Sequence, residues 1–237
     1  MFDQFFEISV APEVISSIIV ILIICVLAII VGIQAHFQDP LKKPKGLLLI
    51  AEIGVKFFDN FVEGLAGQKL PGFGGVVLCS AVYLFISFIF GLTGLPSPVT
   101  YMAIPLSLGL LAFMCIHITS VRVKKWRYFK RYVEPFPVFL PINLISMWSP
   151  VLSLTLRLFG NAVAGMTLMS LLYTFLGSLG KVLFSVGGEA LHAGGVIAPI
   201  VTPFLHAYFD LFSGFIQTTV FISLMTILAS QEVPDEE

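Results

Sequence analysis

The sequence predicts an all-α polytopic membrane protein with five transmembrane helices and one amphipathic helix at the membrane interface. Hydrophobic residues make up 57% of the 237 residues and charged residues 11%, against roughly 25% charged residues in an ordinary soluble domain. Several uncharged apolar runs approach the roughly 20 residues that cross a bilayer as a helix. Because lipid offers the backbone no hydrogen-bond partner, we expect these runs to be helical.

Five runs are apolar enough to cross the membrane, and we expect them to form a single membrane domain over residues 1–237. They cover residues 14–35, 75–95, 101–121, 149–177 and 197–229. Acidic residues, Asp3, Glu7 and Glu13, precede the first run, so we expect a retained span and not a cleaved signal peptide. No internal repeat is visible, and an odd number of spans argues against the duplicated halves of many secondary transporters.

The last two predicted spans are long, and proline residues precede the first of them. At 1.5 Å per residue they would measure roughly 40 to 50 Å, so we expect them to be tilted or to leave the hydrocarbon in part. Residues 138–147 are apolar but too short to cross, and they lie among Pro135, Pro137, Pro141 and Pro150. We expect an interfacial or re-entrant turn there, with a bend before the fourth span.

An amphipathic helix is predicted between the first two spans, over residues 46–66. Glu52, Lys56, Asp59 and Glu63 recur every three or four residues among Leu, Ile, Val and Phe. This pattern places one polar face along a helix. Four charges make a sixth span improbable, so we expect the helix to lie in the interface.

Basic residues set the expected orientation of the chain. Lys42, Lys43 and Lys45 follow the first span, and six Lys or Arg residues lie within residues 122–131 after the third. Cytoplasmic loops carry the excess of such residues, so we expect the N-terminus outside and the C-terminus in the cytoplasm. Aromatic residues also occur in the second basic segment, but they are usual at a membrane interface, and we expect no nucleic-acid partner.

The sequence lacks the common motifs of enzymatic and metal chemistry. Cys25, Cys79 and Cys115 lie in apolar runs without CxxC or Cys/His spacing, so we expect neither a metal nor a cofactor. No GxxxxGK[ST] motif is present to bind nucleotide phosphates. An intramembrane protease using Ser153 with His206 or His192 is an alternative, although HExxH and GxSxG motifs are absent.

Arg157 is the residue of the fourth span that most requires an explanation. It lies about two turns into the run, and an arginine at the centre of a membrane helix costs about 2.5 to 3.5 kcal/mol on insertion scales. Ser153, Asn161, Ala164 and Gly165 share its helix face by their spacing. These residues are polar or small, which favours close approach of another helix. The alternatives are a snorkelling side chain or a hydrogen bond that joins two helices.

The fifth span carries a second group of polar residues on one face. His206 and Asp210 are an i, i+4 pair, and Gln217 follows seven residues later. With the two helices antiparallel, Arg157 and Gln217 lie at similar depths, and Asp210 lies farther outward. Glu189 and His192 in the preceding loop extend this series of titratable groups toward the outside, although ordinary solvated loop residues are the alternative for these two.

These residues resemble a known family. The segment Leu156-Arg157-Leu158-Phe159-Gly160-Asn161 with Ala164-Gly165, followed about sixty residues later by Gln217, is similar to subunit a of the rotary F-type ATP synthase. The five spans, the outside N-terminus and the two long final helices fit the same family. The resemblance implies a non-catalytic stator subunit of the cell inner (plasma) membrane, with the c-ring subunits, peripheral-stalk subunit b, the lipid bilayer and protons as partners.

The resemblance also implies a mechanism. Arg157 would face the carboxylates of a rotating c-ring as a gate between two offset half-channels, with Glu189, His192, His206 and Asp210 in the outer one. Where members of the family carry a glutamate nine residues after the arginine and a histidine seven residues before the glutamine, this chain has Met166 and Asp210. We expect Asp210 to lie level with about Ala164, close to Met166. The alternative function is a stand-alone transporter or channel that binds an anionic solute through Arg157.

Overall fold

The chain folds into helices throughout the part that the structure describes. The computed structural model describes residues 11–38, 43–67, 70, 72–125, 140–183 and 198–231, and no strand occurs within them. The elements are α1 (Pro12–Phe37), α2 (Leu47–Ala66), α3 (Phe73–Ile89) with the 3-10 turns η2 (Phe90–Thr93) and η3 (Pro98–Thr100), α4 (Ala103–Lys124), α6 (Leu140–Leu183), α8 (Ala198–His206), the π-helix η5 (Ala207–Phe212) and α9 (Ser213–Ser230).

Five helices are long and apolar enough to cross a membrane, which confirms the predicted fold class. They are α1, α3 with η2, α4, α6 and the continuous run of α8, η5 and α9. Apart from the two ends of α6, the observed ends lie within three residues of the predicted ones. Lipid thickness fixes the length of an apolar run that can cross, so composition alone locates such helices well.

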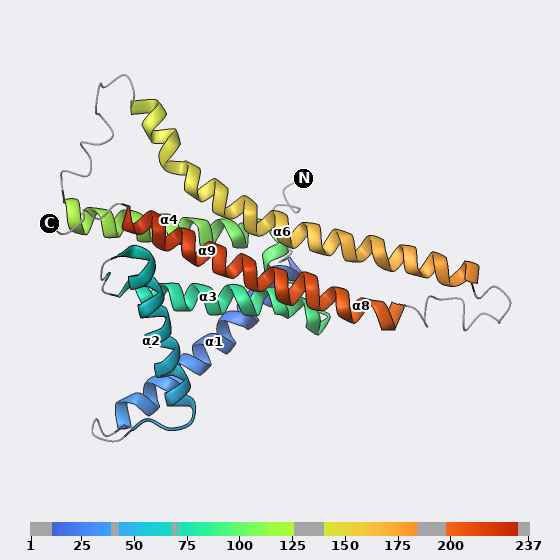
Figure 1. The fold of residues 1–237 in the computed structure, drawn as a ribbon, viewed down its shortest axis with the longest axis horizontal. Coiled ribbons are helices and arrows are strands. Elements are labelled where there is room, and N and C mark those ends of the chain that lie inside the picture. Colours follow the sequence, from blue (N-terminus) through green and yellow to red (C-terminus); the bar gives the residue numbers. More distant parts are fainter. Residues whose placement is uncertain are drawn as a thin grey trace, which may run out of the picture.

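The first span contacts the others through one end only. Its buried residues, Ser16, Ser17 and Val20, all lie in the first half of α1. The Ser17 hydroxyl forms a hydrogen bond of 2.7 Å with the Tyr83 hydroxyl of α3. Toward its C-terminal end α1 diverges from α3, and α2 lies beside it (Figure 1).

The amphipathic helix forms where the sequence predicts it. Figure 1 shows α2 running across the direction of α3 and α4. Glu52 and Lys56 form an exposed i, i+4 ion pair of 2.5 Å, whereas Val62 on another side of the helix is buried in the core. The helix ends at Gly67, whose φ of 70° is the left-handed conformation that favours glycine.

The core of the bundle lies between α2, α3, α4, α6 and α9. Leu84 of α3, Ala112 of α4, Leu158 of α6 and Met225 of α9 are fully buried in one cluster. Glycine permits a close approach of two of these helices, because a Cβ on Gly214 of α9 would lie 2.6 Å from Cβ of Phe88 on α3. Small residues at such crossings are the usual way in which membrane helices pack closely.

The fourth span is longer and more continuous than predicted. The interfacial or re-entrant turn expected at residues 138–147 is wrong, because residues 140–147 form the first two turns of α6, which continues without a break to Leu183. Pro141 lies in the first turn, where no backbone N–H is needed, and Pro150 is accommodated inside the helix. At 1.5 Å per residue the 44 residues measure about 66 Å.

The last two spans lie side by side and run in opposite directions. α6 crosses α4 at an incline and then follows α9 and α8 (Figure 1). Between α8 and α9 the chain forms one π-helical segment, η5, which the sequence did not predict. Residues 126–139 and 184–197 lie outside the described residues, and they include Pro135, Pro137 and most of the second basic segment.

Candidate functional site

Two contacts set the register of α6 against the last span. The Ser213 hydroxyl donates a hydrogen bond of 3.0 Å to Oδ1 of Asn161. One turn farther along α6, a Cβ on Gly165 would lie 3.9 Å from Cβ of Phe209, at van der Waals contact. Both pairs fit a single antiparallel register, in which Arg157 is level with Gln217 and Asp210 is level with Ala164. The levels expected from the sequence therefore hold in the structure.

Arg157 lies on the outer surface of the helix pair. Its side chain is exposed on this chain, and no residue in the described part of the chain forms a hydrogen bond or an ion pair with it. Small exposed residues lie on the same side of α6 as Arg157, namely Ser149, Ser153, Gly160, Ala164 and Thr167, and the adjacent Leu156 is exposed as well. A second helix can therefore approach α6 closely beside the guanidinium.

The helix face predicted for Arg157 is divided between two surroundings. Ser153 and Ala164 are exposed together with Arg157, whereas Asn161 and Gly165 face the last span of the same chain. Gln217 lies one turn beyond Ser213 on α9 and is 8% exposed. Asn161 thus joins two helices of this chain, and the surface beside Arg157 is left to Ser153, Ala164 and their small neighbours.

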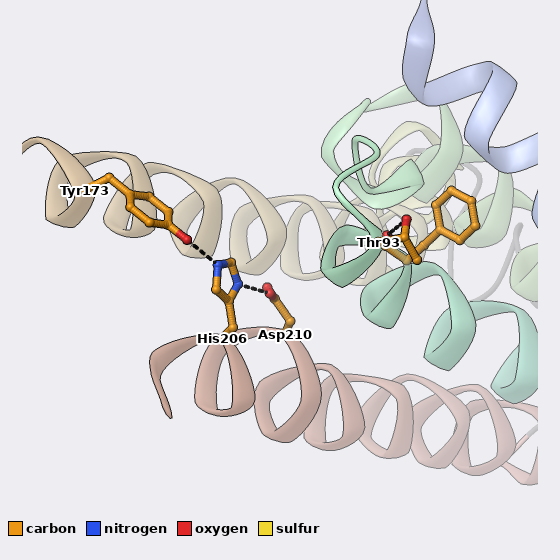
Figure 2. A network of polar contacts seen from close by, with 5 residues as sticks. Thr93, Tyr173, His206 and Asp210 are labelled. Atoms are coloured by element: carbon orange, nitrogen blue, oxygen red, sulfur yellow. Dashed lines mark hydrogen bonds and ion pairs between the residues drawn. The ribbon is translucent and has the colours of Figure 1, made fainter. Parts of the chain in front are cut away.

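Three polar side chains form a hydrogen-bonded chain toward the other end of the helix pair. Nδ1 of His206 lies 2.5 Å from Oδ2 of Asp210, and Nε2 of the same ring lies 2.9 Å from the Tyr173 hydroxyl. Figure 2 shows Tyr173 reaching from α6 toward His206 and Asp210 on the last span. The His206 and Asp210 side chains are 28% and 24% exposed, so these hydrogen-bonded side chains lie at the rim of the packed core.

A cavity of about 490 Å³ opens beside this hydrogen-bonded chain. It lies between α6, the last span and the turns η2 and η3. Polar groups on its wall include Asn161, Tyr173, His206 and Asp210. Met166 lines the same cavity as Asp210.

The sequence analysis did not predict a role for Tyr173, and two of the predicted residues lie outside the part of the chain that the structure describes. Nothing in the spacing of Tyr173 relates it to His206, because their contact depends on the register of two separate helices. Glu189 and His192 lie outside the described residues. No group of three His, Cys, Asp or Glu residues that could hold a metal ion occurs in the ranges that the structure describes.

The helix register excludes the Ser153–His206 pair that the protease alternative would use. In the observed register Ser153 is level with Phe221, fifteen residues from His206 along the last span. This separation is about 20 Å at the helical rise. A nucleophile and its base must lie within hydrogen-bond reach, so Ser153 and His206 cannot act together.

Comparison with known proteins assigns the chain to a protein family. Residues 14–229 match the family described as ATP synthase A chain. The chain belongs to this family. As a member of the ATP synthase A chain family, it is a stator subunit in the membrane sector of an F-type ATP synthase, a multi-pass membrane protein that takes part in ion transport while other subunits carry out catalysis.

Two individual relatives match most of the chain, and a third matches a little less than half of it. "ATP synthase subunit a" of Mycoplasmoides gallisepticum is 30% identical over 238 residues, covering 95% of this chain and 79% of the relative. "ATP synthase subunit a" of Limosilactobacillus fermentum is 31% identical, covering 86% and 85%. "ATP synthase subunit a, sodium ion specific" of Propionigenium modestum is 35% identical over 111 residues, covering 46% of this chain and 31% of the relative.

Proposed function

We propose that Arg157 is the gate between two offset half-channels and that it meets the carboxylates of a rotating c-ring one after another. One observation carries this proposal. The guanidinium is exposed and has no partner among the described residues, while the nearest acid in the register, Asp210, is already bonded to His206. Asp210 is also level with Ala164, about 10 Å outward from Arg157 along the helix. Within the described residues no counter-charge for Arg157 is present, and we assign that role to the carboxylates of the ring.

The chemistry of arginine fits a gate. A guanidinium remains protonated at any accessible pH and has no acceptor. It attracts the charged form of a carboxylate and so favours release of the carboxyl proton, but it cannot relay that proton. Protons then cannot cross directly from one half-channel to the other, and each must travel on the ring.

The cavity beside Asp210 supports an outer half-channel. It is polar on one side and reaches from the turns η2 and η3 toward Asn161. We place Asp210, His206 and Asn161 on its path, Gln217 at its inner end beside Arg157, and Glu189 and His192 at its outer mouth. A hydronium ion in the cavity gives its proton to the Asp210 carboxylate, which becomes a neutral carboxyl group, and leaves a water molecule.

The remaining partners and the topology belong to the same proposal. The chain forms a single membrane domain in the cell inner (plasma) membrane, with its N-terminus outside and its C-terminus in the cytoplasm. It contacts the c-ring through the small residues beside Arg157, and it also contacts peripheral-stalk subunit b. Each proton supplies about 2.3 kcal/mol per 100 mV of membrane potential, so several protons drive each ATP.

Replacement of Arg157 tests the gate. In the complete ATP synthase reconstituted into vesicles, Arg157→Ala should abolish proton-driven ATP synthesis while the complex still assembles, because ring carboxylates then pass without losing their protons. Arg157→Lys is the matched variant: it keeps the charge but not the planar guanidinium, and we expect a large loss of synthesis from it as well. Coupled synthesis at a normal rate by Arg157→Ala would refute the gate.

A further inference from the structure

We infer that Tyr173 is a positioning residue of the outer half-channel, which holds the His206 ring in the one tautomer that donates to Asp210. The inference rests on the proposed function for its effect on proton uptake. Its structural part concerns only the three side chains and stands on their geometry. Both ring nitrogens of His206 have a partner, Asp210 at Nδ1 and Tyr173 at Nε2.

With Asp210 ionised and His206 neutral, the chemistry of the three groups sets the direction of both hydrogen bonds. An ionised carboxylate only accepts, so the proton of a neutral His206 lies on Nδ1 and is donated to Asp210. Nε2 then carries a lone pair, and the Tyr173 hydroxyl is its donor. Removing that hydroxyl would leave Nε2 without its donor and allow the ring to exchange tautomers or to rotate. A histidine that is oriented through its second nitrogen by another side chain is a common arrangement at functional sites.

The surroundings leave this role to Tyr173. Among the residues that the structure describes, Tyr173, His206 and Asp210 are the titratable side chains that line the cavity. The wall formed by η2 and η3 adds only neutral residues there, among them Ser97 and Thr100. Tyr173 comes from α6 and the other two come from the last span (Figure 2), so this hydrogen bond ties the donor orientation of His206 to the packing of the two helices.

Tyr173→Phe removes the one hydroxyl and keeps the aromatic ring. The matched control is Tyr208→Phe, which removes a hydroxyl two residues from His206. Tyr208 stacks on Phe212, is 55% exposed, and makes no hydrogen bond through its hydroxyl within the described residues. Both variants are made in the complete ATP synthase in lipid vesicles.

The first readout is the protonation of the ring nitrogens, measured by nitrogen NMR of histidine-labelled enzyme, with the His206 signals assigned by their loss in His206→Gln. We expect a bare Nε2 and a protonated Nδ1 in the unmodified enzyme and in Tyr208→Phe, and a mixture of tautomers in Tyr173→Phe. The same tautomer in Tyr173→Phe as in the unmodified enzyme overturns the inference. This readout does not depend on whether Arg157 is a gate.

The second readout is the initial rate of proton uptake driven from the outer side of the ring. We expect Tyr173→Phe to lower it about 3- to 10-fold, the factor that corresponds to one hydrogen bond of ordinary strength, and Tyr208→Phe to leave it unchanged. A changed tautomer with an unchanged uptake rate overturns the positioning role in proton uptake. Failure of the proposed function would be detected by a different result, namely coupled ATP synthesis by the Arg157→Ala variant.

Discussion

The Asp210 carboxylate comes from the last span, but the cavity that it lines is shared with α6. Its Oδ2 accepts from His206, and the cavity that it faces is also lined by Met166 of α6. A carboxylate can take up a proton from the cavity that it lines, whichever helix carries it. The cavity that Met166 lines therefore contains an acid, although α6 has no carboxyl group at that position.

Asp210→Asn should slow proton uptake from the outside more than it reduces assembly of the complex. The amide keeps the size of the side chain and can still accept from His206, but it cannot take up a proton. Proton flux in vesicles that contain the reconstituted enzyme measures the effect, and the yield of intact complex serves as the control. Flux equal to that of the unmodified enzyme would remove Asp210 from the path.

The last span combines tight packing in α9 with an irregular turn in η5. Gly214 begins the packed part, where α9 lies against Phe88 of α3. Ser213, the neighbouring residue, forms the hydrogen bond to Asn161. The element is therefore fixed on two sides, by α3 and by α6, directly after the π-helical residues.

Gly214→Ala should destabilise the packing of α3 against α9. The added Cβ would lie 2.6 Å from Cβ of Phe88, and overpacking of this kind costs about 1 to 3 kcal/mol. We expect a lower midpoint of thermal unfolding and less assembled complex. Gly32→Ala is the control, since a Cβ on Gly32 of α1 meets nothing within 4 Å. Equal midpoints for the two variants would contradict the close approach.

Most of the fold could be predicted because the membrane constrains it. The first span was expected at residues 14–35 and is observed as Pro12–Phe37, since an apolar run of bilayer length has few other structures open to it. The continuity of α6 through Pro150 was missed, because proline indicates a break in sequence and only the surrounding packing shows that the helix tolerates it. The π-helical turn has no local sequence signal.

The candidate site could be predicted only in part, for a related reason. Helical spacing correctly grouped His206 with Asp210, because i, i+4 pairs lie within one helix. The spacing around Arg157 did not separate the exposed Ser153 from Asn161, which faces α9. That separation, like the contact of Tyr173 with His206, depends on how two helices pack and is not encoded in either helix alone.

At the scale of the whole molecule, basic residues follow the first and the third spans. Lys43 and Lys45 are exposed between α1 and α2, and Arg122 is exposed at the end of α4. These positions follow the first and third spans, so an odd number of crossings separates each of them from the N-terminus. The positive-inside rule then predicts a cytoplasmic C-terminus after five spans.

Reporter fusions check this orientation. Green fluorescent protein fused after residue 237 should fluoresce, because it folds in the cytoplasm, and alkaline phosphatase at the same point should be inactive. The control is alkaline phosphatase fused after residue 95, beyond the second span, where it should be active outside. The reverse pattern at these two positions would invert the proposed topology and place the Asp210 cavity on the inner side.

The π-helical turn at residues 207–212 makes the number of residues in this segment matter as much as their identity. A π turn holds one residue more than an α turn. Deleting one residue there would convert the wide turn into an ordinary α turn and would leave α8 in nearly the same orientation relative to α9. Deleting a second residue would rotate α8 by about 100°, so Ser213 would still meet Asn161 but His206 would turn away from Tyr173. One deletion between His206 and Ser213 should therefore be tolerated, whereas a second deletion should not.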